Sequence, residues 1–320
     1  MRRREFAMLL CTAPFACPGP LSAQSAAGRI PRIGFLFNVR SELVVALMQG
    51  LRDAGYVDGQ NMLAETRFYG ETLERVGEFA NELIAVKCDL IFAAGPYAIA
   101  AAMRATSSIP IVGMDLESDP VASGWASTLS RPGGNLTGLF LDLPGLGGKL
   151  IELLKEAVPT ASALAALWDS SVGEVQFRAT EDAARSAGLS LLSLPIRRRE
   201  DLPNFFDRAL REGVHGVLVL SSPLIFGQRS EIAALALNAR LPTISLFTLF
   251  PRAGGLLAYG PNFPAMFARA ATYIDRILKG AKAGDMPIER RAGSSSSSIS
   301  RPRRRSASIF PRCCSCAPTG

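Results

Sequence analysis

The sequence predicts an α/β protein with two doubly wound, parallel-sheet lobes joined by a hinge. Short continuous apolar segments alternate with segments of helical spacing, a pattern typical of parallel strands that are buried on both faces. This alternation pauses after Leu141 and starts again at Lys149. The chain has 320 residues, which is long enough for two domains of ordinary size.

In the first half, the apolar segments predict strands and the amphipathic segments predict helices. Gly55 ends the first helix and Pro96 begins the third, as their backbone preferences favour. The predicted strands are 30–37, 62–69, 89–94, 109–114 and 136–141, and the predicted helices are 42–54, 73–86 and 96–105.

The second half repeats this pattern without a sequence repeat that can be aligned. Its predicted strands are 163–168, 189–196, 216–220, 242–247 and 256–259, and its predicted helices are 149–157, 175–187, 202–212, 230–238 and 263–278. Parallel sheets of this kind bind ligands beyond the carboxyl ends of their strands. The cleft between two such lobes is therefore the expected binding site.

The net charge of +7 does not indicate a nucleic-acid-binding protein, because the basic residues are at the two ends. Residues 290–320 contain seven arginines and no acid, and residues 1–29 contain four arginines and one glutamate. The remaining body is slightly acidic and has no basic stripe to bind DNA or RNA. We therefore expect no nucleic-acid partner.

The N-terminus predicts an export signal at residues 1–23. Arg2–Arg4 precede an apolar segment, and small residues precede a plausible cleavage site after Ala23. Arg3–Phe6 form a twin-arginine-like pattern, whereas a lipoprotein signal at Cys17 is the weaker interpretation. No disulfide framework is predicted, because Cys88 is the only cysteine in the body. We expect an exported, periplasmic protein.

The sequence lacks the residue combinations of the common enzyme classes. His215 is the only histidine, so neither a zinc site of the usual ligands nor a Ser-His-Asp triad is expected. Gly145–Lys149 resembles a phosphate-binding loop, but Leu150 stands where that loop requires Ser or Thr. Asp115, Asp119 and Asp169 could act as acid–base groups, although helix capping or binding of a ligand ammonium explains them as well. We expect no catalysis, no metal and no cofactor.

Several segments resemble the substrate-binding proteins of ABC transporters that are related to tryptophan- and tyrosine-binding members. Ser118–Gly124 and Leu129–Gly138 are similar to the motifs DPV-x-x-G and L-x-RPGGN-[VL]-TG of that family. Gly254–Asn262 and Ala270–Lys282 resemble GGL-x-x-YGPN and AA-x-YVDKILKGAK. Arg2–Phe6 resembles the usual opening, so the resemblance covers residues 1–289.

The resemblance implies a type I periplasmic-binding fold and a function in solute uptake. One lobe would comprise Ile30–Leu141 plus Pro261–Lys282, and the other would comprise Pro144–Leu257, with hinge crossings near Leu141 and Tyr259. The implied partners are a small-molecule solute and the permease and ATPase of the inner membrane, and the protein is expected to be a monomer. A ligand sensor of the same fold that signals to a membrane partner is the alternative.

Residues that follow the predicted strands are the candidates for ligand binding. Aromatic rings could stack on an apolar ligand, a carboxylate could bind its amine, and the helix start beside Gly95 could attract a carboxylate. The loop after the first strand is shorter than is usual in the family, so ligand specificity does not carry over there. The candidates are Asn38, Gly95, Tyr97, Asp115, Trp168, Asp169, Ser222, Phe226 and Phe247.

The last segment, Arg290–Gly320, departs from the family pattern. It is rich in Ser, Arg, Cys and Pro, where the family continues with an apolar strand and a closing helix. Codons can be chosen for residues 299–320 that, read two bases later, encode a family-like ending that begins LKTAAALG. We interpret the segment as a disordered, frameshifted tail that leaves a strand edge unpaired; a genuine basic, disordered arm is the alternative.

Overall fold

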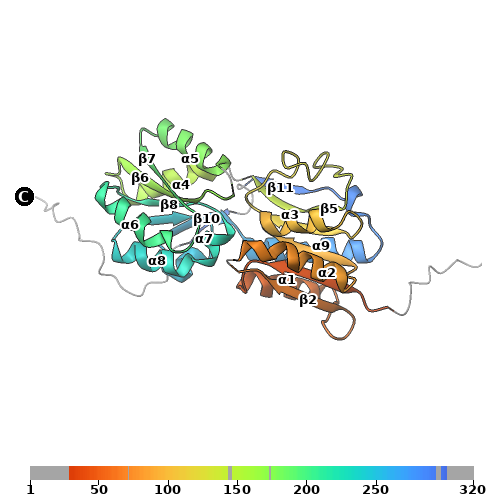
Figure 1. Ribbon diagram of the computed structural model, residues 1–320. Helices are drawn as coiled ribbons and strands as arrows, with labels where there is room; N and C mark the ends of the chain where they lie inside the picture. The colour runs from red at the N-terminus through yellow and green to blue at the C-terminus, as the bar shows by residue number, and fades with distance from the viewer. Residues whose placement is uncertain (1–28, 71, 143–145, 173, 293–296, 301–320) are drawn as a thin grey trace, which may run out of the picture. The chain divides into compact units, whose positions relative to one another are not determined.

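The computed structural model describes residues 29–70, 72–142, 146–172, 174–292 and 297–300. These residues form two six-stranded sheets with helices packed against them (Figure 1). The predicted fold class, α/β with two doubly wound parallel sheets, is confirmed. Within the described residues, no helix is both long and apolar enough to cross a membrane.

The first sheet has the strand order β11-β5-β4-β3-β1-β2, and all its neighbouring strands are parallel. Its strands are β1 (Arg32–Phe37), β2 (Leu63–Phe68), β3 (Leu90–Ala94), β4 (Ile111–Asp115), β5 (Leu136–Asp142) and β11 (Glu289–Ala292). Its helices are α1 (Glu42–Asp53), α2 (Val76–Ala85), α3 (Pro96–Ala105) and α9 (Phe263–Leu278), with short 3-10 turns η1 (Leu73–Arg75) and η4 (Ala283–Asp285).

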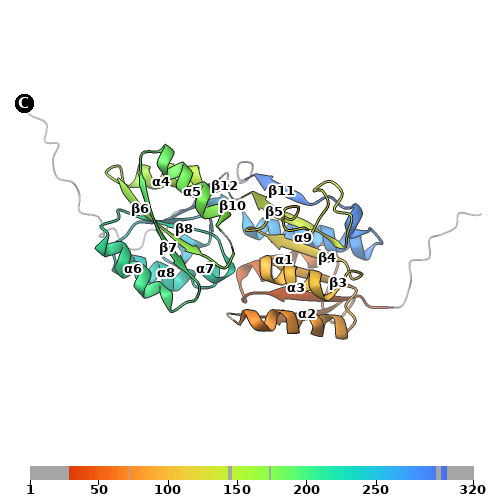
Figure 2. The same cartoon turned by 45° about the horizontal axis from the view of Figure 1, so that its top comes forward.

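The alternation of side chains along β1 explains the two layers of helices on this sheet. Phe35 belongs to the cluster that includes Leu47 of α1 and Ile274 of α9, whereas Leu36 points to the other face, toward Leu83 and Ile99. Figures 1 and 2 show α9, coloured blue, among the red and orange elements of this sheet. The chain therefore returns to its first sheet after completing most of the second.

The second sheet has the order β12-β10-β9-β8-β6-β7, and only the edge strand β12 is antiparallel among these. Its strands are β6 (Ala163–Asp169), β7 (Ser190–Ile196), β8 (Val217–Val219), β9 (Thr243–Ser245), β10 (Leu257–Pro261) and β12 (Ser297–Ser300). Its helices are α4 (Gly147–Ala157), α5 (Val175–Ser186), α6 (Asp201–Arg211), α7 (Pro223–Gly227) and α8 (Arg229–Asn238), with the 3-10 turn η3 (Phe250–Ala253).

We call residues 31–142 and 263–292 the first lobe, and residues 146–261 and 297–300 the second lobe. In each sheet the strand order reverses beside the first strand of the lobe, β1 or β6. Ligands of such sheets bind at this reversal, beyond the carboxyl ends of the strands. We therefore expect the ligand site at the segments that follow β1, β3, β4, β6, β8 and β9.

The structure differs from the sequence-based expectation at the end of the chain. Residues 289–292 pair with β5 as β11, and Ser297–Ser300 pair with β10 as β12, so these residues are not a disordered tail. Strand pairing uses backbone N–H and C=O groups, which a serine supplies as well as a valine does. The expected signal peptide and residues 301–320 lie outside the described residues.

Candidate functional site

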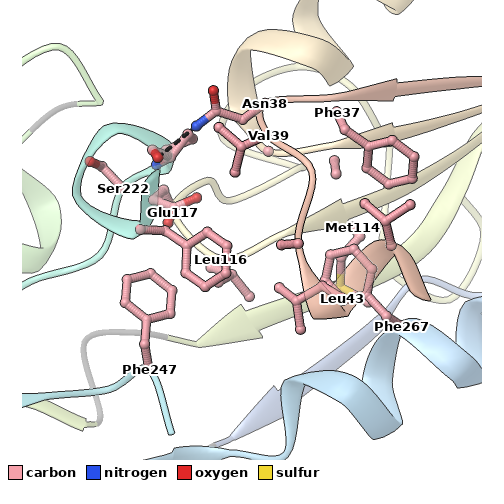
Figure 3. Close-up of a pocket in the computed structure, with 16 residues that line it drawn as sticks. Phe37, Asn38, Val39, Leu43, Met114, Leu116, Glu117, Ser222, Phe247 and Phe267 are labelled. Carbon is pink, nitrogen blue, oxygen red and sulfur yellow. Dashed lines mark hydrogen bonds between the residues drawn. The ribbon is translucent and has the colours of Figure 1, made fainter. Parts of the chain in front are cut away.

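An apolar cavity lies at the carboxyl ends of both sheets. The first lobe contributes Phe37, Met114 and Phe267, and the second lobe contributes Phe226 and Phe247. Figure 3 shows Phe247 on one side of this cavity and Phe37, Met114 and Phe267 on the other. Apolar walls with few polar groups are typical of a small-molecule site.

Local structure after β8 holds one aromatic wall in place. The Ser222 hydroxyl accepts a hydrogen bond from the backbone N–H of Ile225 (3.0 Å) and thereby caps the short helix α7. This helix carries Phe226, whose ring lies 5.0 Å from that of Phe247. The Arg229 guanidinium covers the Phe226 ring at 4.6 Å, so Phe226 and Phe247 form a supported aromatic wall.

The two lobes meet at one border of the apolar cavity. The Asn38 amide, after β1, donates a hydrogen bond to the carbonyl of Pro223 in α7 (2.6 Å), as Figure 3 shows. Gly95, after β3, has φ 87°, and an added Cβ would lie 3.2 Å from Cγ of Pro223. A side chain at position 95 would therefore be strained and would press on the opposite lobe.

Two carboxyl groups at the end of β4 lie next to each other, on Asp115 in the strand and on Glu117 after it. Asp115 is fully buried, and its Oδ1 accepts hydrogen bonds from the backbone N–H groups of Leu116 (2.7 Å) and Glu117 (3.2 Å). Glu117 lines the apolar cavity and accepts a hydrogen bond from the hydroxyl of Ser221 in the second lobe. Burial, and next the charge of Asp115, raise the pKa of Glu117 well above its ordinary value.

A second, polar cavity adjoins the apolar one. Tyr69 and Tyr97 of the first lobe line it together with Asp169 and Ser171 of the second lobe. The hydroxyls of Tyr97 and Ser171 lie 2.5 Å apart, which links the lobes a second time. Burial raises the pKa of Tyr97 to about 12, so this hydroxyl stays neutral at physiological pH.

The structure brings five of the nine predicted site residues together at the apolar cavity, and Asn38 also lines the polar one. Tyr97 lines the polar cavity, and Asp169 lines both it and a small third cavity beside Trp168. Asp115 is fully buried and lines neither the apolar nor the polar cavity. The five at the apolar cavity are Asn38, Gly95, Ser222, Phe226 and Phe247.

Trp168 is less available to a ligand than the sequence suggested. Its ring stacks on Phe177 of α5 with centroids 4.9 Å apart, and its Nε1 donates a hydrogen bond to the Ser193 hydroxyl (3.1 Å). Only 7% of the residue is exposed. One ring face is therefore used for packing within the second lobe.

Sequence reasoning missed several polar residues of the two cavities, among them Glu117, Tyr69 and Arg197. Positions 115 and 117 are two residues apart, so an extended chain places them on the same side, and this signal could have identified Glu117. Tyr69 follows β2, the strand beside β1 at the sheet reversal. The sequence candidates in the first lobe lie at the ends of β1, β3 and β4, so the end of β2 is an addition from the structure.

Residues 38–299 match the model of the ABC transporter substrate binding proteins. The chain belongs to this family. The match extends over β12, the last described strand.

Several known proteins are similar to this substrate-binding protein in sequence or in fold. A tyrosine-binding protein of Clostridioides difficile is 25% identical over 248 residues, which cover 75% of this chain and 69% of the relative. The crystal structure of an ABC domain in complex with L-Trp, from Streptococcus pneumonia, has a TM-score of 0.76 at 21% identity and covers 85% of this chain and 91% of that one. A conserved domain protein of Vibrio cholerae has a TM-score of 0.77 at 19% identity, with the same coverage of both chains.

The family match shows that the protein is a substrate-binding protein. The cavities agree with this conclusion, because they combine apolar walls with hydrogen-bonding groups from two lobes. Among the described residues, no group of three or more His, Cys, Asp or Glu side chains could hold a metal ion.

Proposed function

We propose that this protein captures an amino acid with an apolar or aromatic side chain in the cleft between its lobes. The observation that carries the proposal is the apolar cavity, because aromatic side chains from both lobes line it beside a polar cavity. The tyrosine-binding relative and the L-Trp complex of a structural neighbour support an amino acid as the solute. We propose further that this occurs in the periplasm.

Contacts between the lobes support a ligand-dependent closure about a hinge. Asn38 binds the Pro223 carbonyl, Tyr97 contacts Ser171, and Glu117 accepts from Ser221. Arg229 of the second lobe adds an ion pair with Glu42 at 3.2 Å. A ligand that touches both lobes would favour the state in which these contacts form, since only that state satisfies both halves of the site.

The direct test is a binding screen with the purified protein. L-tryptophan and L-tyrosine at about 100 times their dissociation constant should stabilise the folded state by about 2.7 kcal/mol, seen as a higher melting temperature. X-ray scattering should show a smaller radius of gyration with ligand. L-glutamate and a hexose serve as controls. If neither aromatic amino acid binds while a sugar does, the proposed solute class is wrong.

A transport role requires a permease and an ATPase, which we propose as partners. A sensor of the same fold would bind the same solute without supporting its uptake. Deleting the gene and measuring uptake of the labelled solute at micromolar concentration separates the two functions. Unchanged uptake would favour the sensor.

A further inference from the structure

The polar cavity contains two buried polar atoms that have no hydrogen-bond partner among the described residues. They are Oδ2 of Asp169 and the hydroxyl oxygen of Tyr69. Asp169 is 1% exposed and Tyr69 is 3% exposed, and both line this cavity. Buried polar atoms are rarely left without partners, because each one costs free energy. A ligand group that donates hydrogen bonds would satisfy both atoms.

Asp169 is held so that one oxygen remains available. Its Oδ1 accepts hydrogen bonds from the backbone N–H of Ser171 (3.0 Å) and from the Ser171 hydroxyl. These bonds fix the carboxylate, and Ser171 in turn contacts Tyr97 of the other lobe. Oδ2 of Asp169 is therefore a positioned acceptor in a cavity that both lobes line.

The other buried carboxyl groups are poorer acceptors for a ligand cation. Oδ2 of Asp115 also has no partner, but Asp115 does not line the polar cavity. Glu117 lies beside Asp115, and desolvation, followed by the charge of Asp115, raises the pKa of Glu117 well above its ordinary value, which favours its neutral form. A neutral Glu117 does not attract an ammonium group as a carboxylate does.

Arg197 lines the same cavity and offers a positive charge. Its Nε donates a hydrogen bond to the Ser170 hydroxyl (3.2 Å), and it forms no ion pair within the part of the chain that the structure describes. Its neighbours are paired instead, Arg198 with Asp201 (3.5 Å) and Arg199 with Glu231 (2.7 Å). One free guanidinium and one positioned carboxylate match the two charges of an amino acid head group.

The polar and apolar cavities share a border. Asn38, Val39 and Pro223 line both of them, and the hydrogen bond between Asn38 and Pro223 lies at this border. We propose that the polar cavity binds the head group of the amino acid, with the ammonium at Asp169 and Tyr69, the carboxylate at Arg197, and the side chain extending past Asn38 into the apolar cavity. This inference rests on the proposed function and adds the orientation of its ligand.

Calorimetry with matched ligands and variants tests the orientation. The ligands are L-tryptophan, indole-3-propionate, which lacks the ammonium, and tryptamine, which lacks the carboxylate. Asp169→Asn should weaken L-tryptophan and tryptamine binding about 10-fold or more and change indole-3-propionate binding less than about 2-fold. Arg197→Gln should weaken the binding of L-tryptophan and of indole-3-propionate by about 5-fold or more and leave the binding of tryptamine unchanged.

The controls are Asp182→Asn and Arg211→Gln, which remove the same charges at exposed helix positions away from the polar cavity. Melting temperatures of all variants show whether a loss of binding is a loss of folding. If Asp169→Asn weakens the binding of all three ligands equally, or weakens the binding of none, the proposed orientation is wrong. The proposed function is not affected by either result. If the wild-type protein binds none of L-tryptophan, L-tyrosine and L-leucine, both proposals fail.

Discussion

Glu117 shows how a single side chain can respond to the environment that the fold creates. It follows β4 by two residues, beside the buried Asp115, and its hydrogen bond partner Ser221 comes from the other lobe. Burial and the adjacent negative charge both disfavour its ionised form, and they raise its pKa. The same residue in an unfolded chain would ionise at its ordinary pKa of about 4.3.

This pKa difference predicts a pH dependence of stability. Above the unfolded-state pKa, the unfolded chain releases the Glu117 proton while the folded protein keeps it, so stability falls as pH rises toward the folded-state pKa. The Glu117→Gln variant has no ionisable side chain at this position, so it does not undergo this fall in stability with rising pH. We expect the free energy of unfolding of the variant, relative to that of the wild type, to increase between pH 4 and pH 8.

Urea denaturation of both proteins at several pH values measures this gain. Glu212→Gln, at an exposed helix end, controls for the removal of one acidic side chain. A difference between Glu117→Gln and wild type that stays constant from pH 4 to pH 8 would show that Glu117 titrates normally in the folded protein.

At the scale of single elements, a family-like motif has a structural role in the first sheet. Gly138, the last residue of Leu129–Gly138, lies in β5 opposite Gly113 of β4 and has φ 140°. A Cβ at this position would be 1.9 Å from the carbonyl oxygen of Gly113, which no side-chain rearrangement can relieve. The two strands therefore pair closely because this residue lacks a side chain.

Gly138→Ala should consequently destabilise the protein by about 3 kcal/mol or more, or prevent folding. Gly134→Ala is the matched control from the same motif, because an added Cβ there meets nothing within 4 Å. We expect the control to change stability by less than about 0.5 kcal/mol. Chemical denaturation of both variants measures the effects, and equal stabilities would show that the strands can separate to accept the methyl group.

At the scale of the whole molecule, the chain returns to each sheet after visiting the other. Residues from α9 to β11 complete the first lobe, and Ser297–Ser300 add the edge strand β12 beside β10. The family match ends at residue 299, in this strand. The interpretation of the last residues as a frameshifted ending stays a prediction. Any such frameshift has to be consistent with the pairing of β11 with β5 and of β12 with β10.

Three versions of the chain test the contribution of the ending. Removing residues 301–320 should leave the denaturation midpoint unchanged, because their Ser-, Arg- and Pro-rich sequence has little apolar surface to bury. Removing residues 293–320 should lower the midpoint, because it leaves the edge of β10 unpaired. Restoring the family-like ending in the other reading frame should raise it. If the present chain is as stable as the restored one, the frameshift interpretation is wrong.

The alternation of strands and helices, the number of lobes and the strand ends that carry Asn38, Gly95, Ser222, Phe226 and Phe247 were predictable from the sequence. These features depend on local hydrophobic spacing and turn residues, which a single chain segment contains. The location of the site was also predictable, because parallel sheets bind ligands beyond the carboxyl ends of their strands, but the strand order in each sheet comes from the structure.

Only the tertiary structure decided which polar side chains share a cavity. The contacts of Asn38 with Pro223 and of Glu117 with Ser221 join residues far apart in the sequence. Trp168 and Asp169 are adjacent in the sequence and both largely buried, yet the ring packs on Phe177 while the carboxylate keeps an unpartnered oxygen in a cavity. The pairing of the serine-rich strand β12 also depends on an open edge at β10, because backbone groups pair wherever a partner strand offers them.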